Sequence, residues 1–266
     1  MMTETPANDP YRDIAELYDL EHASFDADIE LLLNFADAVG DPILELGCGS
    51  GRVLVPLAEA GFTVVGLDSS RPMLDRAEEA IAAAGVADRV TLVEGDMRAS
   101  DQAPGGPFGL VIFSLNSLMH LTTVSDQRRA LASARRALDP RGQLVIDSMN
   151  PSPDQLRHLM DGPHLEGGWR LADGSSVDKW SHRRLSPATQ IIDTLLWYDR
   201  TAPDGTFTRL RSEFLLRYVH AAELGLMLEL AGFTDPMYYG SYDLDPYENE
   251  SDRLLVTAEV THTPAP

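Results

Sequence analysis

The sequence predicts an α/β fold in which a mostly parallel sheet carries an inserted antiparallel β-meander. Short apolar runs alternate with longer helical patterns through the first 149 residues, as expected for parallel strands that are covered on both faces. From Val177 to Val219, polar and apolar residues alternate instead along three long stretches. That alternation is typical of antiparallel strands with one wet face.

The strands and helices of the main sheet can be predicted in order. Pro72 marks a helix start, and Asp139 to Gly142 is a turn signal. The predicted strands are Ile43–Leu46, Thr63–Asp68, Val90–Asp96, Leu110–Leu115 and Gln143–Met149. The predicted helices are Asp13–Tyr18, Ile29–Val39, Val53–Ala60, Pro72–Ala84 and Ser125–Leu138.

The second half of the chain has a different pattern. Residues Asn150 to Gly168 are rich in Pro, Gly and His and show no clear period, so we expect irregular structure there. The segments SVDKWSHRR, QIIDTLLWYDR and TFTRLRSEFLLRYV predict the meander. A helix that is ended by Gly232 and a final strand, Arg253–Val260, complete the chain.

Length and composition favour a single folded unit. The 266 residues, of which 44% are hydrophobic, suit one large α/β domain or one domain with an insertion. We expect one domain over residues 1–266, an N-terminal helical cap over residues 1–40 and an inserted lid over residues 150–219.

The charge balance limits the class of partner. The formal net charge is −21, and such a surface repels nucleic acids and anionic membranes. Proteins that bind these polyanions do so through Lys and Arg. A small molecule or a short peptide is the expected partner. The single cysteine, Cys48, excludes an intrachain disulfide and a cysteine metal cluster.

Targeting signals are not evident. The N-terminal segment lacks the charged and apolar regions of a secretory signal, and no apolar run approaches the roughly 18 residues of a membrane helix. We therefore expect a cytoplasmic protein, and the oligomeric state stays open.

A glycine-rich junction follows the first predicted strand. The segment ILELGCGSGR leaves a buried strand and enters a helix, where glycines permit positive φ and close approach of a ligand. A dinucleotide fingerprint would place glycine at the position of Arg52. Glu45, two residues before Gly47, disfavours a pyrophosphate and suits an ammonium group.

Two further acidic residues end the next strands. Asp68 lies 21 residues after Gly47, an offset at which a carboxylate meets ribose hydroxyls in nucleotide-binding βαβ units. Asp96 ends the third strand, where it could accept a bond from an adenine amino group while Met97 packs on the ring. The ends of successive parallel strands meet in one crevice, which makes this crevice the predicted ligand site.

The motifs ELGCGSG, GLDSS and EGDM resemble those of class I S-adenosylmethionine-dependent methyltransferases. The resemblance covers Ile43 to Met149 and the C-terminal part. It implies a Rossmann-like, seven-stranded sheet whose last strand, RLLVTAEV, is antiparallel, and S-adenosyl-L-methionine as the cofactor. A less specific resemblance links the inserted strands to a small-molecule subgroup with a β-meander lid.

This resemblance assigns roles to residues along the crevice. The glycine loop holds the methionine part of the cofactor, Asp68 the ribose, and Asp96 with Met97 the adenine. Tyr18 is either a contact of the methionine carboxylate or an ordinary packing residue. The full predicted cofactor-binding set is Tyr18, Glu45, Gly47, Cys48, Gly49, Gly51, Asp68, Ser69, Met73, Gly95, Asp96, Met97 and Ser114.

Candidates for catalysis and acceptor binding follow the fourth strand or lie in the meander. His120 is the candidate base, with a structural hydrogen bond as the alternative reading. Asn116 and Ser117 either position the substrate or the cofactor, or cap a helix. Trp180 and Trp197 either contact the substrate or pack in the core. Five meander arginines are either solvated or an anion site: Arg183, Arg184, Arg209, Arg211 and Arg217.

Metal chemistry is not expected. The histidines His158, His164 and His182 match no zinc spacing and are expected on the surface or in the lid. Asp147 ends the fifth strand without a partner acidic pair, so we expect a solvated strand end there and no metal.

The leading functional hypothesis is methyl transfer to N, O or C of a small molecule or short peptide. N-methylation is preferred because no strong acid–base set is evident. Three alternatives stay open: a fold repurposed for other chemistry such as a cyclase reaction, a binding protein without catalysis, and an NAD-dependent oxidoreductase, which Arg52 and Glu45 disfavour.

Overall fold

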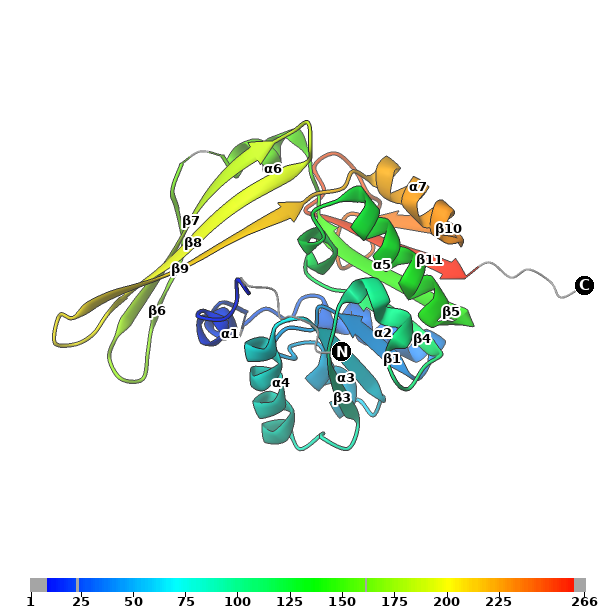
Figure 1. Ribbon diagram of the computed structural model, residues 1–266, viewed down its shortest axis with the longest axis horizontal. Coiled ribbons are helices and arrows are strands. Elements are labelled where there is room, and N and C mark those ends of the chain that lie inside the picture. Colours follow the sequence, from blue (N-terminus) through cyan, green and yellow to red (C-terminus); the bar gives the residue numbers. More distant parts are fainter. Residues whose placement is uncertain (1–8, 23, 161, 261–266) are drawn as a thin grey trace, which may run out of the picture.

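The computed structural model describes residues 9–22, 24–160 and 162–260, and they form two sheets (Figure 1). The larger sheet has seven strands in the order β10-β11-β5-β4-β1-β2-β3. The smaller sheet has four strands in the order β6-β7-β8-β9. The predicted combination of a mostly parallel sheet with an antiparallel meander is confirmed.

Parallel pairing forms the centre of the seven-stranded sheet. Strand β1 (Ile43–Leu46) lies between β2 (Val64–Asp68) and β4 (Phe108–Phe113) and runs parallel to both. Strand β3 (Val90–Glu94) extends the sheet beyond β2, and β5 (Leu138–Met149) extends it beyond β4. All five strands were predicted.

The last strand reverses direction. Strand β11 (Arg253–Val260) pairs antiparallel with β5 on one side and with β10 (Phe233–Tyr239) on the other. The antiparallel last strand is therefore confirmed. Strand β10 was not predicted. Pro236 interrupts its sequence at the place where the pairing with β11 shifts register, and such prolines are tolerated at bulges of edge strands.

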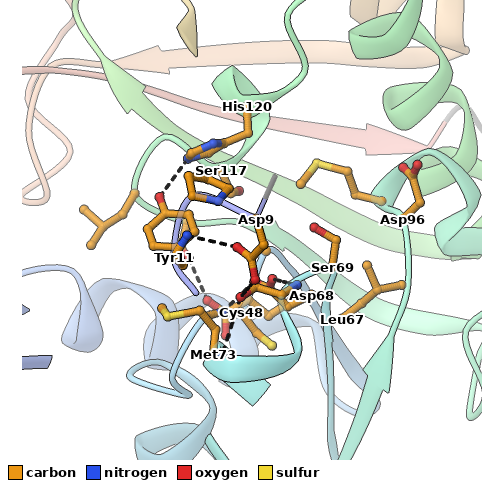
Figure 2. Close-up of a pocket in the computed structure, with 18 of the residues that line it drawn as sticks. Asp9, Tyr11, Cys48, Leu67, Asp68, Ser69, Met73, Asp96, Ser117 and His120 are labelled. Carbon is orange, nitrogen blue, oxygen red and sulfur yellow. Dashed lines mark hydrogen bonds between the residues drawn. The ribbon is translucent and has the colours of Figure 1, made fainter. Parts of the chain in front are cut away.

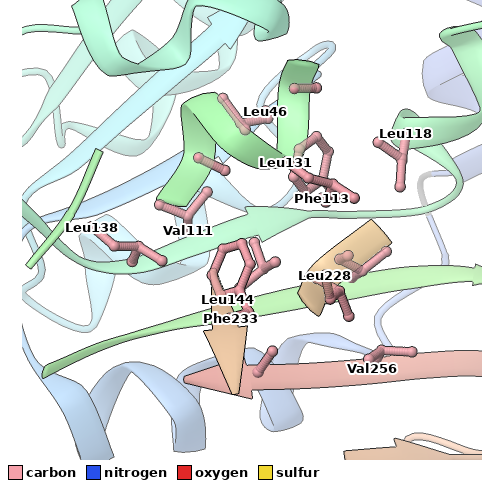
Figure 3. Packing of buried hydrophobic residues seen from close by; sticks show 14 of the residues in the cluster. Leu46, Val111, Phe113, Leu118, Leu131, Leu138, Leu144, Leu228, Phe233 and Val256 are labelled. Carbon is pink, nitrogen blue, oxygen red and sulfur yellow. The ribbon is translucent and has the colours of Figure 1, made fainter. Parts of the chain in front are cut away.

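Helices cover both faces of the large sheet. One core cluster joins the sheet to α2 (Ile29–Val39), α3 (Leu54–Glu59) and α4 (Arg71–Ala84). The other joins it to α5 (Val124–Ala137) and α7 (Ala221–Ala231). Figure 3 shows Leu131 of α5 and Leu228 of α7 packed with Val111, Phe113 and Leu144 of the strands. Strand residues alternate between the two clusters, as a sheet that is buried on both faces requires.

Local signals set the limits of α4. The Ser70 hydroxyl accepts a hydrogen bond from the Met73 N–H, Pro72 occupies the first turn, and Gly85 ends the helix with φ +71°. These are the N-cap, first-turn and C-terminal roles that the three residue types favour.

The four-stranded sheet is an antiparallel meander with one strand more than predicted. It consists of β6 (His164–Arg170), β7 (Ser176–Ser186), β8 (Ile191–Thr201) and β9 (Phe207–Arg217). Helix α1 (Ala15–His22) packs on it, where Leu17 and Ile14 contact Val177 and Tyr198.

The expectation of irregular structure over Asn150–Gly168 was wrong. Helix α6 (Pro153–His158) begins at Ser152, whose hydroxyl accepts from the Gln155 N–H, and β6 follows it. Adjacent glycines in β6 lie at a register shift, which hides the strand's alternation. The predicted turn over Asp139–Gly142 lies inside β5, where the pairing with β4 is irregular.

Buried charges join α1 to its neighbours. Lys179 of β7, only 4% exposed, forms ion pairs with Glu21 of α1 and Glu166 of β6. On the other side of α1, Asp19 pairs with Arg76 of α4. Helix α1 thus lies between the four-stranded sheet and helix α4 (Figure 1).

Within the described ranges, no helix has both the length and the apolar character needed to cross a membrane.

Candidate active site

A cavity of about 720 Å³ opens at the carboxyl ends of β1, β2 and β3. Its walls come from the glycine-rich loop after β1, the ends of β2 and β3, the segment after β4, the N-terminal residues 9–18 and strand β9. This is the edge at which open α/β sheets bind ligands.

Glycines shape the loop between β1 and α3. Gly47 has φ +78°, and a Cβ there would lie 2.7 Å from the Ser117 Cβ. Gly49 has φ +54°, and its Cβ would lie 3.2 Å from the Met73 Cε. Side chains at these two positions would be strained and would reduce the cavity, so the loop presents bare backbone to a ligand.

Asp68 organises the loop from the end of β2. One carboxylate oxygen accepts from the Gly49 N–H and the other from the Ser70 N–H, each at 2.8 Å. Burial raises the pKa of Asp68, and these two backbone hydrogen bonds oppose the rise. Each carboxylate oxygen has a second lone pair, which leaves acceptors for ligand hydroxyls.

Glu45 is a buried carboxyl with a free oxygen. It is 1% exposed, and its Oε1 accepts from the Ser114 hydroxyl at 2.6 Å. Its Oε2 is buried and has no partner among the described residues. Burial raises the pKa of Glu45 to about 8, a shift that the hydrogen bond from Ser114 only partly offsets. A buried, unpartnered acceptor of this kind is costly unless a ligand donor meets it.

Aromatic rings enclose the opposite end of the cavity. The Tyr11 hydroxyl lies 3.1 Å from His120 Nε2, and Tyr11 meets Tyr18 edge-on at 5.6 Å between ring centroids. The Phe214 ring lies 5.7 Å from His120 and 6.2 Å from Tyr11. Burial lowers the pKa of His120 to about 4, so its imidazole is neutral at pH 7. We call Tyr11, Tyr18, His120 and Phe214 the aromatic wall.

Residues 9–11 form a strap along the cavity, held at both ends. The Ser70 hydroxyl donates to Asp9 Oδ2 at 2.7 Å, and the Ser212 hydroxyl donates to the Pro10 carbonyl at 2.6 Å. Asp9 Oδ1 also accepts from the Tyr11 N–H. The strap therefore connects the start of α4 to β9 and positions the Tyr11 ring.

Asp96 lies on the far side of the cavity from Tyr11 and His120 (Figure 2). Its carboxylate binds the Arg98 guanidinium and the Arg98 N–H. Burial alone would raise the pKa of Asp96, but the hydrogen bonds and charge of Arg98 outweigh it and lower the pKa. Asp96 is thus ionised and is already paired with Arg98.

Most of the predicted site residues share this one cavity. Its lining contains His120 and the following members of the predicted cofactor set: Tyr18, Glu45, Gly47, Cys48, Gly49, Asp68, Ser69, Met73, Gly95, Asp96, Met97 and Ser114. Gly51 lies behind it, where a Cβ would be 3.3 Å from the Ala77 Cβ. Asn116 uses its Oδ1 to accept from the Met149 N–H, which is a structural role.

The two tryptophans lie outside the cavity lining. Trp180 and Trp197 are cross-strand partners whose rings stack 6.2 Å apart. Thr194 of β8 pairs with Phe214 of the aromatic wall. Because strand side chains alternate in direction, Trp197 lies on the opposite face of β8 from Thr194. The structure does not bring the tryptophans to His120.

The predicted arginine cluster is paired throughout. Each of the five meander arginines forms an ion pair with a carboxylate of the chain: Arg183 with Glu166, Arg184 with Asp193, Arg209 with Asp199, Arg211 with Glu213, and Arg217 with Glu223. These pairings leave little reason to expect an anionic acceptor.

The expectation of a solvated strand end at Asp147 was wrong. Asp147 is 4% exposed, pairs with Arg253 and accepts from the Tyr242 hydroxyl at 3.0 Å. In the described part of the chain, no group of three or more His, Cys, Asp or Glu side chains could hold a metal ion. The rings of His158 and His164 lie 5.6 Å apart between centroids and are tilted by 43° to one another.

Several site residues had no signal in the sequence. Asp9 and Tyr11 stand in a polar leader, and Phe214 stands in a strand of alternating polarity. Only their long-range contacts reveal them. Arg52, recognised solely as a missing glycine, forms a two-bond ion pair with Asp28 and lies over the Phe25 ring at 5.0 Å. It fixes the glycine loop to the start of α2.

S-adenosylmethionine fits this donor and acceptor set. The unpartnered Oε2 of Glu45 suits its ammonium group, and Asp68 has acceptors for its ribose hydroxyls. The bare loop at Gly47 and Gly49 leaves room for the chain between these two groups. The fold and the cavity together define an α/β enzyme that binds a nucleoside-derived cofactor.

Comparison with known proteins identifies the family. A methyltransferase-domain family model matches residues 43–142. The cypemycin N-terminal methyltransferase of a Streptomyces species is 31% identical over 226 residues, which cover 83% of each chain. The carboxy-S-adenosyl-L-methionine synthase of Chromohalobacter salexigens is 28% identical over 70% of this chain and 67% of its own length. The solved CcbJ methyltransferase of Streptomyces caelestis is 26% identical with a TM-score of 0.69, and the match covers 88% of this chain and 95% of that one.

The chain belongs to the class I S-adenosylmethionine-dependent methyltransferases. It is an S-adenosylmethionine-dependent enzyme, and the cofactor predicted from the glycine loop is confirmed.

Proposed function

We propose that this enzyme transfers a methyl group to an amine nitrogen of a small molecule or short peptide. The observation that carries the proposal is the aromatic wall, in which His120, the only histidine among the described residues that line the cavity, is neutral and has a pKa of about 4. A hydroxyl acceptor needs a base matched to its task. An amine needs only a free lone pair.

The same surroundings favour the reactive form of an amine. Desolvation disfavours the charged form of a titratable group, so the pKa of an ammonium falls when it enters an apolar cavity. The rings of Tyr11, Tyr18 and Phe214 provide such surroundings. An acceptor amine thus loses its proton on entry and exposes its lone pair.

The chain's own residues bind, orient and exclude water. When bound, S-adenosylmethionine supplies an electrophilic methyl group on a sulfonium. Glu45 would hold the ammonium group of the ligand and Asp68 its ribose, and the strap lines the cavity with the Tyr11 ring. The His120–Tyr11 pair is the polar spot in the aromatic wall and orients the acceptor nitrogen by a hydrogen bond.

These contacts support the proposed domain organisation. We assign residues 1–40 as a cap, since the described residues 9–18 supply Tyr11 and Tyr18 to the cavity. We assign residues 150–219 as a lid on a single domain, since β9 supplies Phe214. The predicted acceptor role of Trp180 and Trp197 is then limited to parts of a substrate that lie outside the cavity.

One relative supports nitrogen as the acceptor atom. The first-named relative is an N-terminal methyltransferase. Another is named as a synthase of carboxy-S-adenosyl-L-methionine and not as a methyltransferase, so the test must detect the methylated product as well as consumption of the cofactor.

The test compares matched amines and alcohols. The purified protein is supplied with S-adenosylmethionine and with pairs of small acceptors that differ only in an amino or a hydroxyl group. We expect methylated amine and an equal amount of S-adenosylhomocysteine, measured by mass spectrometry. Methylation of the alcohols alone would refute the choice of nitrogen. Cofactor turnover without any methylated product would refute methyl transfer.

Replacing His120 by alanine is expected to lower kcat with an amine acceptor by about tenfold and to leave cofactor affinity unchanged. The loss stays below the roughly 100-fold or more typical of a removed general base, because His120 orients the amine and does not ionise it. The pKa of His120 is lowered to about 4, so kcat of the wild type shows no ionisation of this residue between pH 5 and pH 8.

His158→Ala is the matched control, since His158 lies outside the cavity lining. Wild-type turnover in His120→Ala would remove His120 from the acceptor site. A loss of more than about 100-fold would instead make it a general base.

A further inference from the structure

Strand β9 presents a free edge to the active-site cavity. The small sheet has the order β6-β7-β8-β9, so β9 has a neighbour on one side only among the described strands. Glu213, Phe214 and Leu215 of β9 line the cavity. The Phe214 ring belongs to the aromatic wall and contacts His120, whereas Leu215 is 46% exposed.

The hydrogen-bond pattern shows which backbone groups face this edge. Just beyond one end of the pairing between β8 and β9, the Tyr218 N–H donates to the Gln190 carbonyl at 3.1 Å. Just beyond the other end, the Ala202 N–H donates to the Thr206 carbonyl at 2.9 Å. The register between these two pairs has no shift. In antiparallel pairing, bonded residues alternate with residues whose N–H and C=O point away.

Even-numbered residues of β9 therefore bond to β8, and odd-numbered residues direct their backbone groups to the free edge. Glu213 and Leu215 are odd-numbered and line the cavity. In the described ranges, their N–H and C=O groups have no hydrogen-bond partner. The next carbonyl along this edge, that of Arg217, accepts from Gln127 of α5 at 3.1 Å, so the free stretch ends there on the α5 side.

We propose that the methyl acceptor is an extended peptide segment that pairs with the β9 edge at Glu213 and Leu215 and presents its N-terminal amine to the His120–Tyr11 pair. This inference rests on the proposed N-methyl transfer and names its substrate class. Added strands gain affinity from main-chain hydrogen bonds and specificity from alternate side chains.

The distance from the β9 edge to His120 and the negative charge of the protein both favour a peptide with a free amino terminus. Phe214, which contacts His120, stands between the two free residues, and strands advance about 3.4 Å per residue. A paired peptide thus has its first residue within one or two positions of His120. The Glu213 carboxylate is 63% exposed at the mouth, and the net charge of −21 attracts a protonated amino terminus.

The decisive variant is Leu215→Pro. Proline lacks the backbone N–H and is tolerated on edge strands whose N–H is not used in the sheet. The substitution removes one donor from the free edge and retains the bonds between β9 and β8. The control is Arg211→Pro, which makes the same change on the same edge outside the cavity lining. Arg211 loses only an exposed ion pair with Glu213, which contributes little.

Two kinds of acceptor distinguish pairing at the β9 edge from binding in the cavity alone. One is a tetrapeptide amide mixture randomised at its first and third positions, and the other is a set of single amino-acid amides. We expect Leu215→Pro to lower kcat/KM for the peptides at least tenfold and for the single amides less than twofold. Arg211→Pro is expected to match the wild type for both probes, and all three proteins are expected to bind S-adenosylmethionine equally.

The outcomes distinguish this inference from the proposed function. If the single amides are methylated but no peptide is, the inferred peptide substrate is wrong and the proposed N-methyl transfer stands. Methylation of neither probe, with the cofactor bound, would overturn both. An equal loss for both probes in Leu215→Pro would also overturn the inference. So would a wild-type dimer that Leu215→Pro converts to monomers, because a second copy would then occupy the edge.

Discussion

Binding of S-adenosylmethionine is expected to release close to one proton at pH 7, and its affinity is expected to rise about tenfold per pH unit from pH 6 toward pH 8. In the free protein, burial holds the pKa of Glu45 at about 8, so this carboxyl is mostly protonated at pH 7. The arriving ammonium group favours the carboxylate form and expels the proton.

The sign of the pH dependence follows from the pKa of Glu45 in the free protein and in the complex. The pKa of Glu45 is raised in the free protein and lower in the complex, so binding is strengthened as pH rises toward about 8. Above this value the free carboxyl is already ionised. The α-amino group of the ligand itself loses its proton near pH 8, and the gain then ends.

Calorimetric titration in buffers of different ionisation enthalpy measures the released proton. Glu45→Gln should bind the cofactor more weakly and release no proton. Methylthioadenosine, which lacks the amino-acid part, is the control ligand and should show no rise between pH 6 and pH 8. A pH-independent affinity in the wild type would refute the assignment of Glu45 to the ammonium group.

Asp68→Ala is expected to weaken cofactor binding by about 1.5–3 kcal/mol, as for the loss of hydrogen bonds to a charged group. This corresponds to a roughly 10- to 150-fold increase in Kd. The carboxylate has two roles, because it also accepts from Gly49 and Ser70 and so holds the loop in place. Titration with S-adenosylmethionine and S-adenosylhomocysteine should show the same loss.

Asp75→Ala controls for the removed negative charge, since Asp75 is an exposed residue of α4 that pairs with Arg71. Asp68→Asn separates the two roles of Asp68, because its amide oxygen can still accept one backbone hydrogen bond. Thermal unfolding monitors the fold of each variant. Unchanged affinity in a folded Asp68→Ala protein would exclude Asp68 from the cofactor site.

The clustering of the candidate cofactor residues in one cavity could be predicted because its signals are local. The loop from Glu45 to Gly51, the carboxylate at Asp68 and the Gly95–Met97 turn each follow a strand whose apolar run is visible in the sequence. Parallel strands that are buried on both faces bring those ends to one edge of the sheet. The spacing along the chain therefore determined the neighbours in space.

The acceptor half could not be predicted because it is assembled from distant segments. The hydroxyl of Tyr11 meets the ring of His120, 109 positions away, and Phe214 joins them from β9. No local period places these residues together. Strands β6 and β10 were missed for a related reason: Gly167 and Pro236 are unfavourable in strands, and only pairing at a bulged edge accommodates them.

The strap over residues 9–11 has a consequence for the rate of turnover. Two hydrogen bonds from Ser70 and Ser212 fasten it, and each contributes on the order of 1 kcal/mol. Their loss defines an open state populated at roughly a few per cent. We expect spent cofactor to leave through that minor state, which would make opening of the strap a step of the catalytic cycle.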